Sequence, residues 1–176
     1  MIFTIAVAVA FVGIAAVLIL AAMRPNQFRV QRSIAINAPP EKIYPMIGDL
    51  RAWTQWSPFE HKDRAMKRVY GSVTTGKGAT YAWEGNRQVG AGHVVIADAV
   101  VPSRMTLKLT MTRPFKAQNI VDFTLTPAGN STTVTWAMRG NVQYFAKVIH
   151  VFVNMDKMVG GEFESGLKNL KAAAEK

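Results

Sequence analysis

The sequence predicts an α+β fold in which a seven-stranded antiparallel sheet wraps around one long C-terminal helix. Seven strand-like runs follow one another with short turns between most of them, and residues 144–176 then change to a helical period. A further element precedes the domain, because residues 1–23 carry no charge and are apolar on every side. The expected order is a transmembrane helix, a strand, two short helices, six strands and the long helix.

Residues 1–23 are long enough to cross a bilayer. As a helix they would extend about 34 Å, against about 30 Å for the hydrocarbon core. Arg24, Arg29 and Arg32 follow the segment and no Lys or Arg precedes it. By the positive-inside rule we expect a single-pass anchor in the inner (cytoplasmic) membrane, with the domain in the cytoplasm. The alternative is a signal peptide, cleaved near Ala21-Ala22-Met23 to release an exported domain.

Residues 24–27 are expected to form a linker and residues 28–176 a single domain. Its first strand covers 27–37, and Pro39-Pro40 then begin a short helix. A second short helix is expected at 49–53, followed by the aromatic loop TQWSPFE. Turn residues separate six further strands, which are expected at 66–73, 79–85, 92–101, 104–112, 117–126 and 132–140.

The C-terminal segment, residues 144–176, has apolar residues at three- and four-residue spacing, as an amphipathic helix requires. We expect one long helix that is weakened or bent at Gly160-Gly161. The sheet offers one apolar face and this helix offers a stripe to cover it. Because a twisted sheet need not close completely on one helix, an apolar hollow is expected between them.

The net charge of +10 is spread along the whole domain, with basic residues mostly single and between acidic ones. No recognition helix, zinc finger or RNP pattern accompanies them, so nucleic acid is not an expected partner. The positive charge is better explained by attraction of the domain to an anionic membrane surface than by nucleic-acid binding. The chain has no cysteine, and His61, His93 and His150 lack metal-ligand spacing, so neither a metal nor a cofactor is expected.

Four segments of the domain carry a family resemblance: RSIAINAPPEKIY (32–44), WSPFEHKD (56–63), YAWEGNRQVGAG (81–92) and MDKMVGGEFESGLKNL (155–170). With them, residues 29–170 resemble the START-like, or SRPBCC, superfamily, and more narrowly its bacterial members labelled polyketide cyclase/dehydrase-like. The resemblance implies the helix-grip fold and a cavity for a hydrophobic small molecule. It does not imply catalysis, because the superfamily includes lipid carriers, cyclases, hydrolases and chaperone-activator-like modules without a shared catalytic set.

Inward positions of the strands, the aromatic loop and the helix give the candidate lining of this cavity. Plain core filling is an equal alternative for any one of them, but aromatic residues and Met together are typical of adaptable apolar pockets. The candidates are Trp56, Phe59, Tyr81, Trp83, Leu107, Leu109, Phe123, Trp136, Phe152 and Met155.

Two carboxylates within strand-like runs are candidates for acid–base chemistry. Strand parity turns Glu84 outward, whereas Asp98 shares parity with Ile96 and is the weak catalytic candidate. A bulge or edge position would instead expose Asp98 to solvent.

Three functions fit these observations. The favoured one is membrane-tethered binding of a hydrophobic small molecule, such as a lipid, quinone or polyketide-like compound, without chemistry. The second is a cyclase- or hydrolase-type enzyme that acts in the same cavity, although no catalytic motif such as GxSxG is visible. The third is a protein-interaction module of the chaperone-activator kind.

Overall fold

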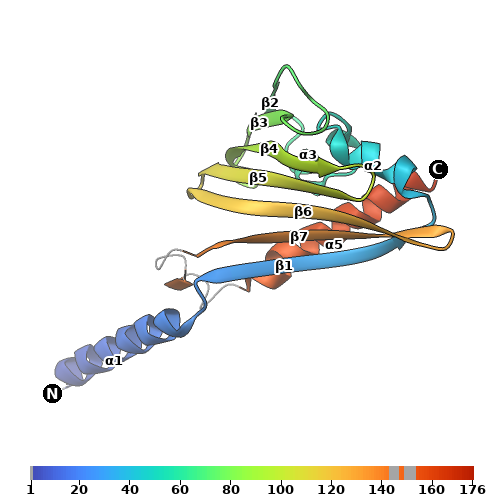
Figure 1. The fold of residues 1–176 in the computed structure, drawn as a ribbon. Helices are drawn as coiled ribbons and strands as arrows, with labels where there is room; N and C mark the ends of the chain where they lie inside the picture. Colours follow the sequence, from blue (N-terminus) through green and yellow to red (C-terminus); the bar gives the residue numbers. More distant parts are fainter. Residues whose placement is uncertain (1, 143–146, 149–153) are drawn as a thin grey trace.

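The computed structural model describes residues 2–142, 147–148 and 154–176, and of residues 2, 3, 5–10 and 155 the backbone alone. Its first element is helix α1 (Ile2–Met23), which projects away from the rest of the chain (Figure 1). Within the described residues, no helix has both the length and the apolar character needed to span a membrane. The membrane span expected over residues 1–23 is therefore not confirmed.

The linker after α1 is fixed to the end of the sheet. Lys147 is buried, and its Nζ donates hydrogen bonds to the carbonyl of Arg24 (2.8 Å) and to Oδ1 of Asn26 (2.5 Å). The backbone N–H of Val142 donates to the carbonyl of Asn26 (2.8 Å). These contacts hold the start of β1 (Gln27–Ile36) beside the end of β7 (Ser131–Asn141).

Seven strands form one antiparallel sheet in the order β1-β7-β6-β5-β4-β3-β2. The strands β2 to β7 form a meander, and β1 pairs with the last of them. The predicted seven-stranded sheet with its C-terminal helix is confirmed, and it is the helix-grip arrangement. The remaining strands are β2 (Lys67–Tyr70), β3 (Thr80–Glu84), β4 (Ala91–Val100), β5 (Arg104–Arg113) and β6 (Ala117–Ala128).

The alternation of β5 shows why these runs form strands with one buried face. Met105 and Leu107 are fully buried, whereas Lys108 is exposed. Opposite them on β6, Phe123 pairs with Met105 and Val121 pairs with Leu107, so the apolar side chains of both strands lie on one face. That inner face faces the helices.

Three short helices lie between β1 and β2: α2 (Pro40–Gly48), a 3₁₀ helix η1 (Ala52–Gln55) and α3 (Pro58–Lys62). The second expected helix is therefore displaced toward the C-terminus, and the expected aromatic loop contains α3. Pro58 explains the difference, because proline at the first helical position has the required φ and lacks an N–H that would be unpaired there.

The C-terminal helix α5 (Met155–Ala174) lies against the inner face of the sheet (Figure 1). Asn154 caps it, since its side chain accepts a hydrogen bond from the N–H of Lys157 (3.0 Å). The expected start near residue 144 is therefore wrong for this helix. Lys147 and Val148 are helical, and the rest of 143–153 lies outside the described residues.

The helix α5 continues through Gly160-Gly161 without a break. Gly160 instead makes room for Arg32 of β1, whose Nη2 would lie 2.1 Å from a Cβ at position 160. The guanidinium of Arg32 crosses α5 there and donates to the side chains of Asp156 (2.9 Å) and Glu164 (2.7 Å).

Candidate functional site

An apolar hollow of about 390 Å³ lies between the inner face of the sheet and the helices α3 and α5. Strands β3 to β7 supply about half of its lining residues. The others come from helical residues, from the turns near residues 88 and 115, and from Ser57 and Met66, which lie next to α3 and β2. Its lining is Trp53, Ser57, Phe59, Glu60, Met66, Tyr81, Trp83, Gln88, Val89, Val94, Leu107, Leu109, Met111, Pro114, Phe115, Ala117, Asn119, Val121, Trp136, Met138, Met158, Val159 and Phe163.

Most of the predicted cavity residues with described side chains line this hollow, namely Phe59, Tyr81, Trp83, Leu107, Leu109 and Trp136. Trp56 and Phe123 do not line it. Both are fully buried and pack on Trp136, with ring centroids 5.5 and 5.0 Å away. Phe152 and the side chain of Met155 lie outside the described residues. That the hollow holds a ligand stays a prediction.

Trp136 forms the part of the wall that faces α5. Its ring stacks on Phe163 at 4.2 Å, and the absence of a side chain at Gly166 allows this approach, since a Cβ there would lie 2.7 Å from the indole. The indole Nε1 of Trp136 is buried and has no hydrogen-bond acceptor among the described residues. A buried N–H without a partner costs about 1–3 kcal/mol.

A charged cluster lies at one side of the otherwise apolar hollow. The carboxylate of Glu60 in α3 is buried, with 4% of its side chain exposed. Its Oε1 accepts a hydrogen bond from the hydroxyl of Tyr81 (2.5 Å), and its Oε2 accepts one from Nε of Arg68 (2.7 Å). Arg68 is in turn anchored by donating to the carbonyl of Met66 (2.7 Å). The buried negative charge is therefore compensated.

The cluster keeps Tyr81 protonated. Burial is the main cause that raises the pKa of Tyr81, and the hydrogen bond to Glu60 and the charge of Glu60 raise it further. The pKa of Arg68 is also raised, chiefly by its hydrogen bond to Glu60. Tyr70 stacks on Tyr81 at 5.0 Å and shields the phenol on one side.

This arrangement is better suited to recognition than to proton transfer. Both oxygens of Glu60 already accept a hydrogen bond, and Tyr81 donates its only proton to Glu60. The hydroxyl oxygen of Tyr81 retains lone-pair capacity for a ligand donor. The hollow therefore combines apolar walls with a polar side that Glu60 and Tyr81 form.

Glu60 was not among the predicted site residues, because it ends the expected aromatic loop TQWSPFE and no local pattern marks it as buried. The available signal was the pair of motifs that carry the resemblance, which contact each other in the structure. Oδ2 of Asp63 accepts a hydrogen bond from the N–H of Asn86 (2.7 Å), and Nδ2 of Asn86 donates to the carbonyl of Lys62 (3.3 Å). Gly85 permits this contact, since a Cβ there would lie 2.7 Å from Asp63.

The inward orientation that parity predicts for Asp98 is not what the structure shows. The register between β4 and β5 shifts between Ile96 and Asp98, so a bulge changes the parity of the strand at this point. The side chain of Asp98 is 47% exposed and pairs with Arg104 at 3.0 Å. Glu84 also faces outward and pairs with Arg113 at 2.9 Å. Neither carboxylate lines the hollow.

Among the described residues, no three or more His, Asp or Glu side chains are close enough together to hold a metal ion. Nε2 of His61 lies 3.1 Å from the carbonyl of Thr54, and His93 is exposed. His150 lies outside the described residues.

Comparison with known proteins identifies the family. The model of the family described as polyketide cyclase / dehydrase and lipid transport matches residues 27–175. The chain belongs to this family. This agrees with the resemblance that the sequence motifs carry. No curated protein matches the chain.

Solved structures share the fold at low sequence identity. Protein CV1439 from Chromobacterium violaceum is 16% identical, with a TM-score of 0.61 over 87% of this chain and 99% of its own. The KanY protein is 17% identical, with a TM-score of 0.62 over 86% and 100%. The Aha1 protein from Colwellia psychrerythraea, solved as a dimer, is 18% identical, with a TM-score of 0.58 over 84% and 96%. At these identities the likeness shows the fold alone.

Proposed function

We propose that the protein binds a hydrophobic small molecule, such as a lipid, quinone or polyketide-like compound, in the hollow between the sheet and α5. The observation that carries this proposal is an apolar space between the sheet and the helices, walled largely by aromatic, aliphatic and Met side chains. Its volume of about 390 Å³ lies within the range of small-molecule sites. A largely apolar molecule is the ligand that these walls suit.

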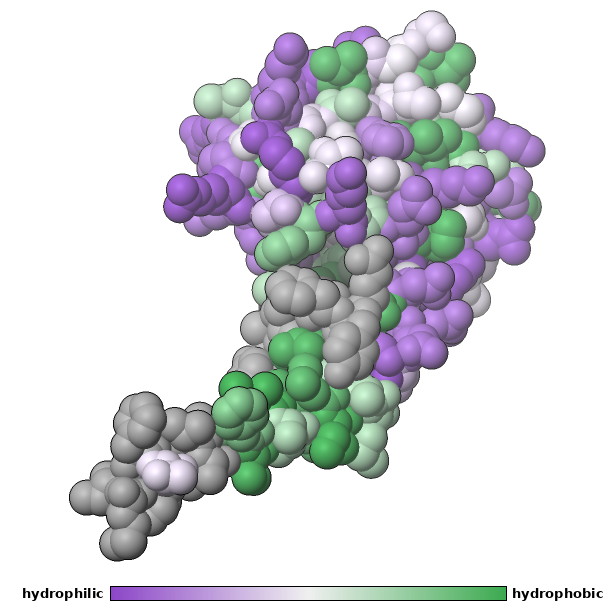
Figure 2. All heavy atoms as spheres, turned by 90° about the vertical axis from the view of Figure 1, so that its left-hand side faces the viewer, coloured by the Kyte–Doolittle hydropathy of each residue, from purple (hydrophilic) through white to green (hydrophobic). Residues whose placement is uncertain are grey.

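The second part of the proposal is that α1 tethers the domain to the inner membrane, with the domain in the cytoplasm. Three facts support the tether: the uncharged sequence of residues 1–23, the helix that forms over it, and the exposure of its apolar side chains. Phe11 and Met23, for example, are 69% and 78% exposed. Figure 2 shows the described side chains of α1 as a hydrophobic column below a mostly hydrophilic body.

An enzyme of the cyclase or hydrolase type is the second candidate, because Glu60 and Tyr81 are ionisable residues that line the hollow. If the protein is an enzyme, both a substrate and its product should co-purify with it from the cell. Tyr81→Phe should then stop conversion of the substrate without stopping its binding. If the protein only binds its ligand, a single apolar species should co-purify with it and stay chemically unchanged during incubation with the protein. Mass spectrometry of the extracted ligand, before and after incubation with the protein, separates the two candidates.

Native mass spectrometry of the full chain tests the binding proposal, with two substitutions on β6 as a matched pair. Ala117→Trp places an indole in the hollow, whereas Ala128→Trp places the same group at the exposed far end of the strand. We expect a bound apolar species on the wild-type chain and on Ala128→Trp, and its loss from Ala117→Trp. Equal occupancy of the two variants would contradict binding in this hollow.

A further inference from the structure

The mouth of the hollow has an exposed apolar rim. Pro114 and Phe115, in the turn between β5 and β6, line the hollow, and so does Met158 in the first turn of α5. The side chains of Phe115 and Met158 are nevertheless 64% and 55% exposed. Two large apolar residues from distant parts of the chain are thus left in solvent at the entrance.

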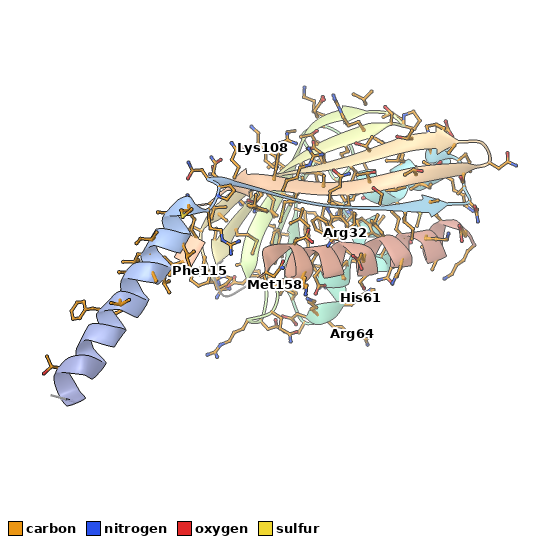
Figure 3. The ribbon with its side chains drawn as sticks, turned by 90° about the horizontal axis from the view of Figure 1, so that it is seen from below. Arg32, His61, Arg64, Lys108, Phe115 and Met158 are labelled. Atoms are coloured by element: carbon orange, nitrogen blue, oxygen red, sulfur yellow. The ribbon has the colours of Figure 1, made fainter. Side chains whose placement is uncertain are left out.

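This mouth lies at the end of the sheet from which α1 leaves. The register fixes its place, since Gln27 of β1 pairs with Asn141, Gly140 pairs with Asn119, and Met111 pairs with Ala117 beside the turn. Figure 3 shows Phe115 and Met158 at the end of the molecule that carries α1. Only residues 24–26 separate α1 from β1, and the contacts of Lys147 hold this linker to the sheet.

Basic residues surround the apolar rim. Lys116 follows Phe115, Lys157 precedes Met158, and Arg87 lies in the turn between β3 and β4, which reaches the same end of the sheet. All three are exposed and none forms an ion pair with another described residue. Apolar side chains ringed by unpaired basic ones are complementary to the headgroup region of an anionic bilayer.

We propose that the mouth of the hollow is a membrane-docking surface, at which Phe115 and Met158 enter the interface of a bilayer that contains anionic lipids. The inference rests on the proposed tether and deepens the proposed function, because it names the bilayer as the phase from which the ligand reaches the hollow. An apolar ligand then passes between lipid and protein without crossing water.

The absence of cysteine from the chain allows a direct test on the full protein. Phe115→Cys and Val101→Cys each provide one site for an environment-sensitive fluorophore. Val101 is the matched control, because it is 73% exposed in the turn between β4 and β5, at the opposite end of the sheet. Each labelled chain is reconstituted in vesicles of phosphatidylcholine, with and without phosphatidylserine.

We expect the label at position 115 to shift to the blue and to be quenched by lipids that carry a nitroxide near the headgroup. The effect should require phosphatidylserine and weaken as salt is added, whereas the label at position 101 should stay water-exposed throughout. Equal emission and quenching at the two positions would overturn the proposal. Loss of the bound species in native mass spectrometry, with insertion at 115 preserved, would instead defeat only the proposed ligand binding.

Discussion

Glu60 is the residue on which the polar side of the hollow depends. A carboxylate with 4% exposure is stable there because Arg68 and Tyr81 both donate to it. Removal of one partner from a buried ion pair is costly, since the other charge stays buried without compensation. This asymmetry distinguishes Glu60 from the exposed carboxylates of the sheet.

Arg68→Ala is therefore expected to lower the free energy of unfolding by about 3–5 kcal/mol, because the carboxylate of Glu60 would stay buried without its cation. Arg113→Ala is the control, because the pair of Glu84 with Arg113 is exposed and is worth about 1 kcal/mol or less. Chemical denaturation of the full chain, followed by tryptophan fluorescence, measures both variants. Similar losses for the two would show that the Glu60 cluster does not stabilise the fold as described.

The two adjacent glycines of α5 provide a second contrast at the scale of single residues. A Cβ at position 160 would collide with Arg32, whereas a Cβ at 161 meets nothing within 4 Å. Gly160→Ala should be about 1 kcal/mol less favourable than Gly161→Ala, because it displaces the flexible end of Arg32 and weakens its two partly exposed ion pairs. Gly161→Ala should stabilise the protein, by up to about 1 kcal/mol, because alanine is the better helix former. Thermal unfolding of both variants checks the prediction, and it fails if Gly160→Ala stabilises the protein as much as Gly161→Ala.

The docking of α5 on β1 is the contact between elements that most directly depends on charge. Arg32 lowers the pKa of Asp156 through a hydrogen bond, and Asp156 also lies in the first turn of the helix, where a negative charge is favourable. Because the folded pKa is below the ordinary value of 3.8, the carboxylate stabilises the fold above that pH. The stabilisation disappears as the pH falls through the folded pKa.

Asp156→Asn should thus be less stable than the wild-type chain at neutral pH, and the difference should shrink as the pH falls below the ordinary value of 3.8 and disappear below the lowered pKa of Asp156. Lys157→Gln is a suitable control, since Lys157 is exposed beside Asp156 and forms no ion pair with another described residue. Denaturation midpoints measured across this pH range decide the matter. A difference that persists unchanged at low pH would rule out the charged form of Asp156 as its source.

At the scale of elements, the sequence predicted the strands well, because alternation and turn residues are local signals. Each expected strand is present, and the largest displacement affects β2, which is shorter than its expected range of 66–73. The helices were less predictable, because their bounds depend on contacts with residues that are distant in the sequence. Gly160-Gly161 indicates a bend when α5 is considered alone, and only the position of Arg32 on β1 explains why the helix continues.

The same distinction applies to the site. Parity along the strands placed Tyr81, Trp83 and Leu107 on the wall of the hollow. It failed at Asp98, because one bulge reverses parity and leaves no mark in the sequence. Strand parity also could not reveal Glu60, because this residue is in a helix. Its burial depends on contacts of α3 with Arg68 of β2 and Tyr81 of β3.

For the whole molecule, Figure 1 shows α1 at one end and the C-terminus at the other. Figure 3 shows Phe115, which lies on the rim of the hollow, at the end that carries α1. The family and the solved structures establish the helix-grip fold that creates the hollow. The ligand and the membrane tether are proposals that this arrangement supports.

The most direct test of ligand binding is a measurement on Trp136. The other three indoles donate to backbone carbonyls, those of Trp53, Trp56 and Trp83 to Ile47, Met46 and Val89. A nitrogen–proton NMR correlation spectrum of the full chain separates the four indole signals. A total lipid extract of the cells in which the protein is made should move the Trp136 signal, because its ring lines the hollow, and should leave in place the signal of Trp56, which does not line it. An unchanged Trp136 signal would contradict the account.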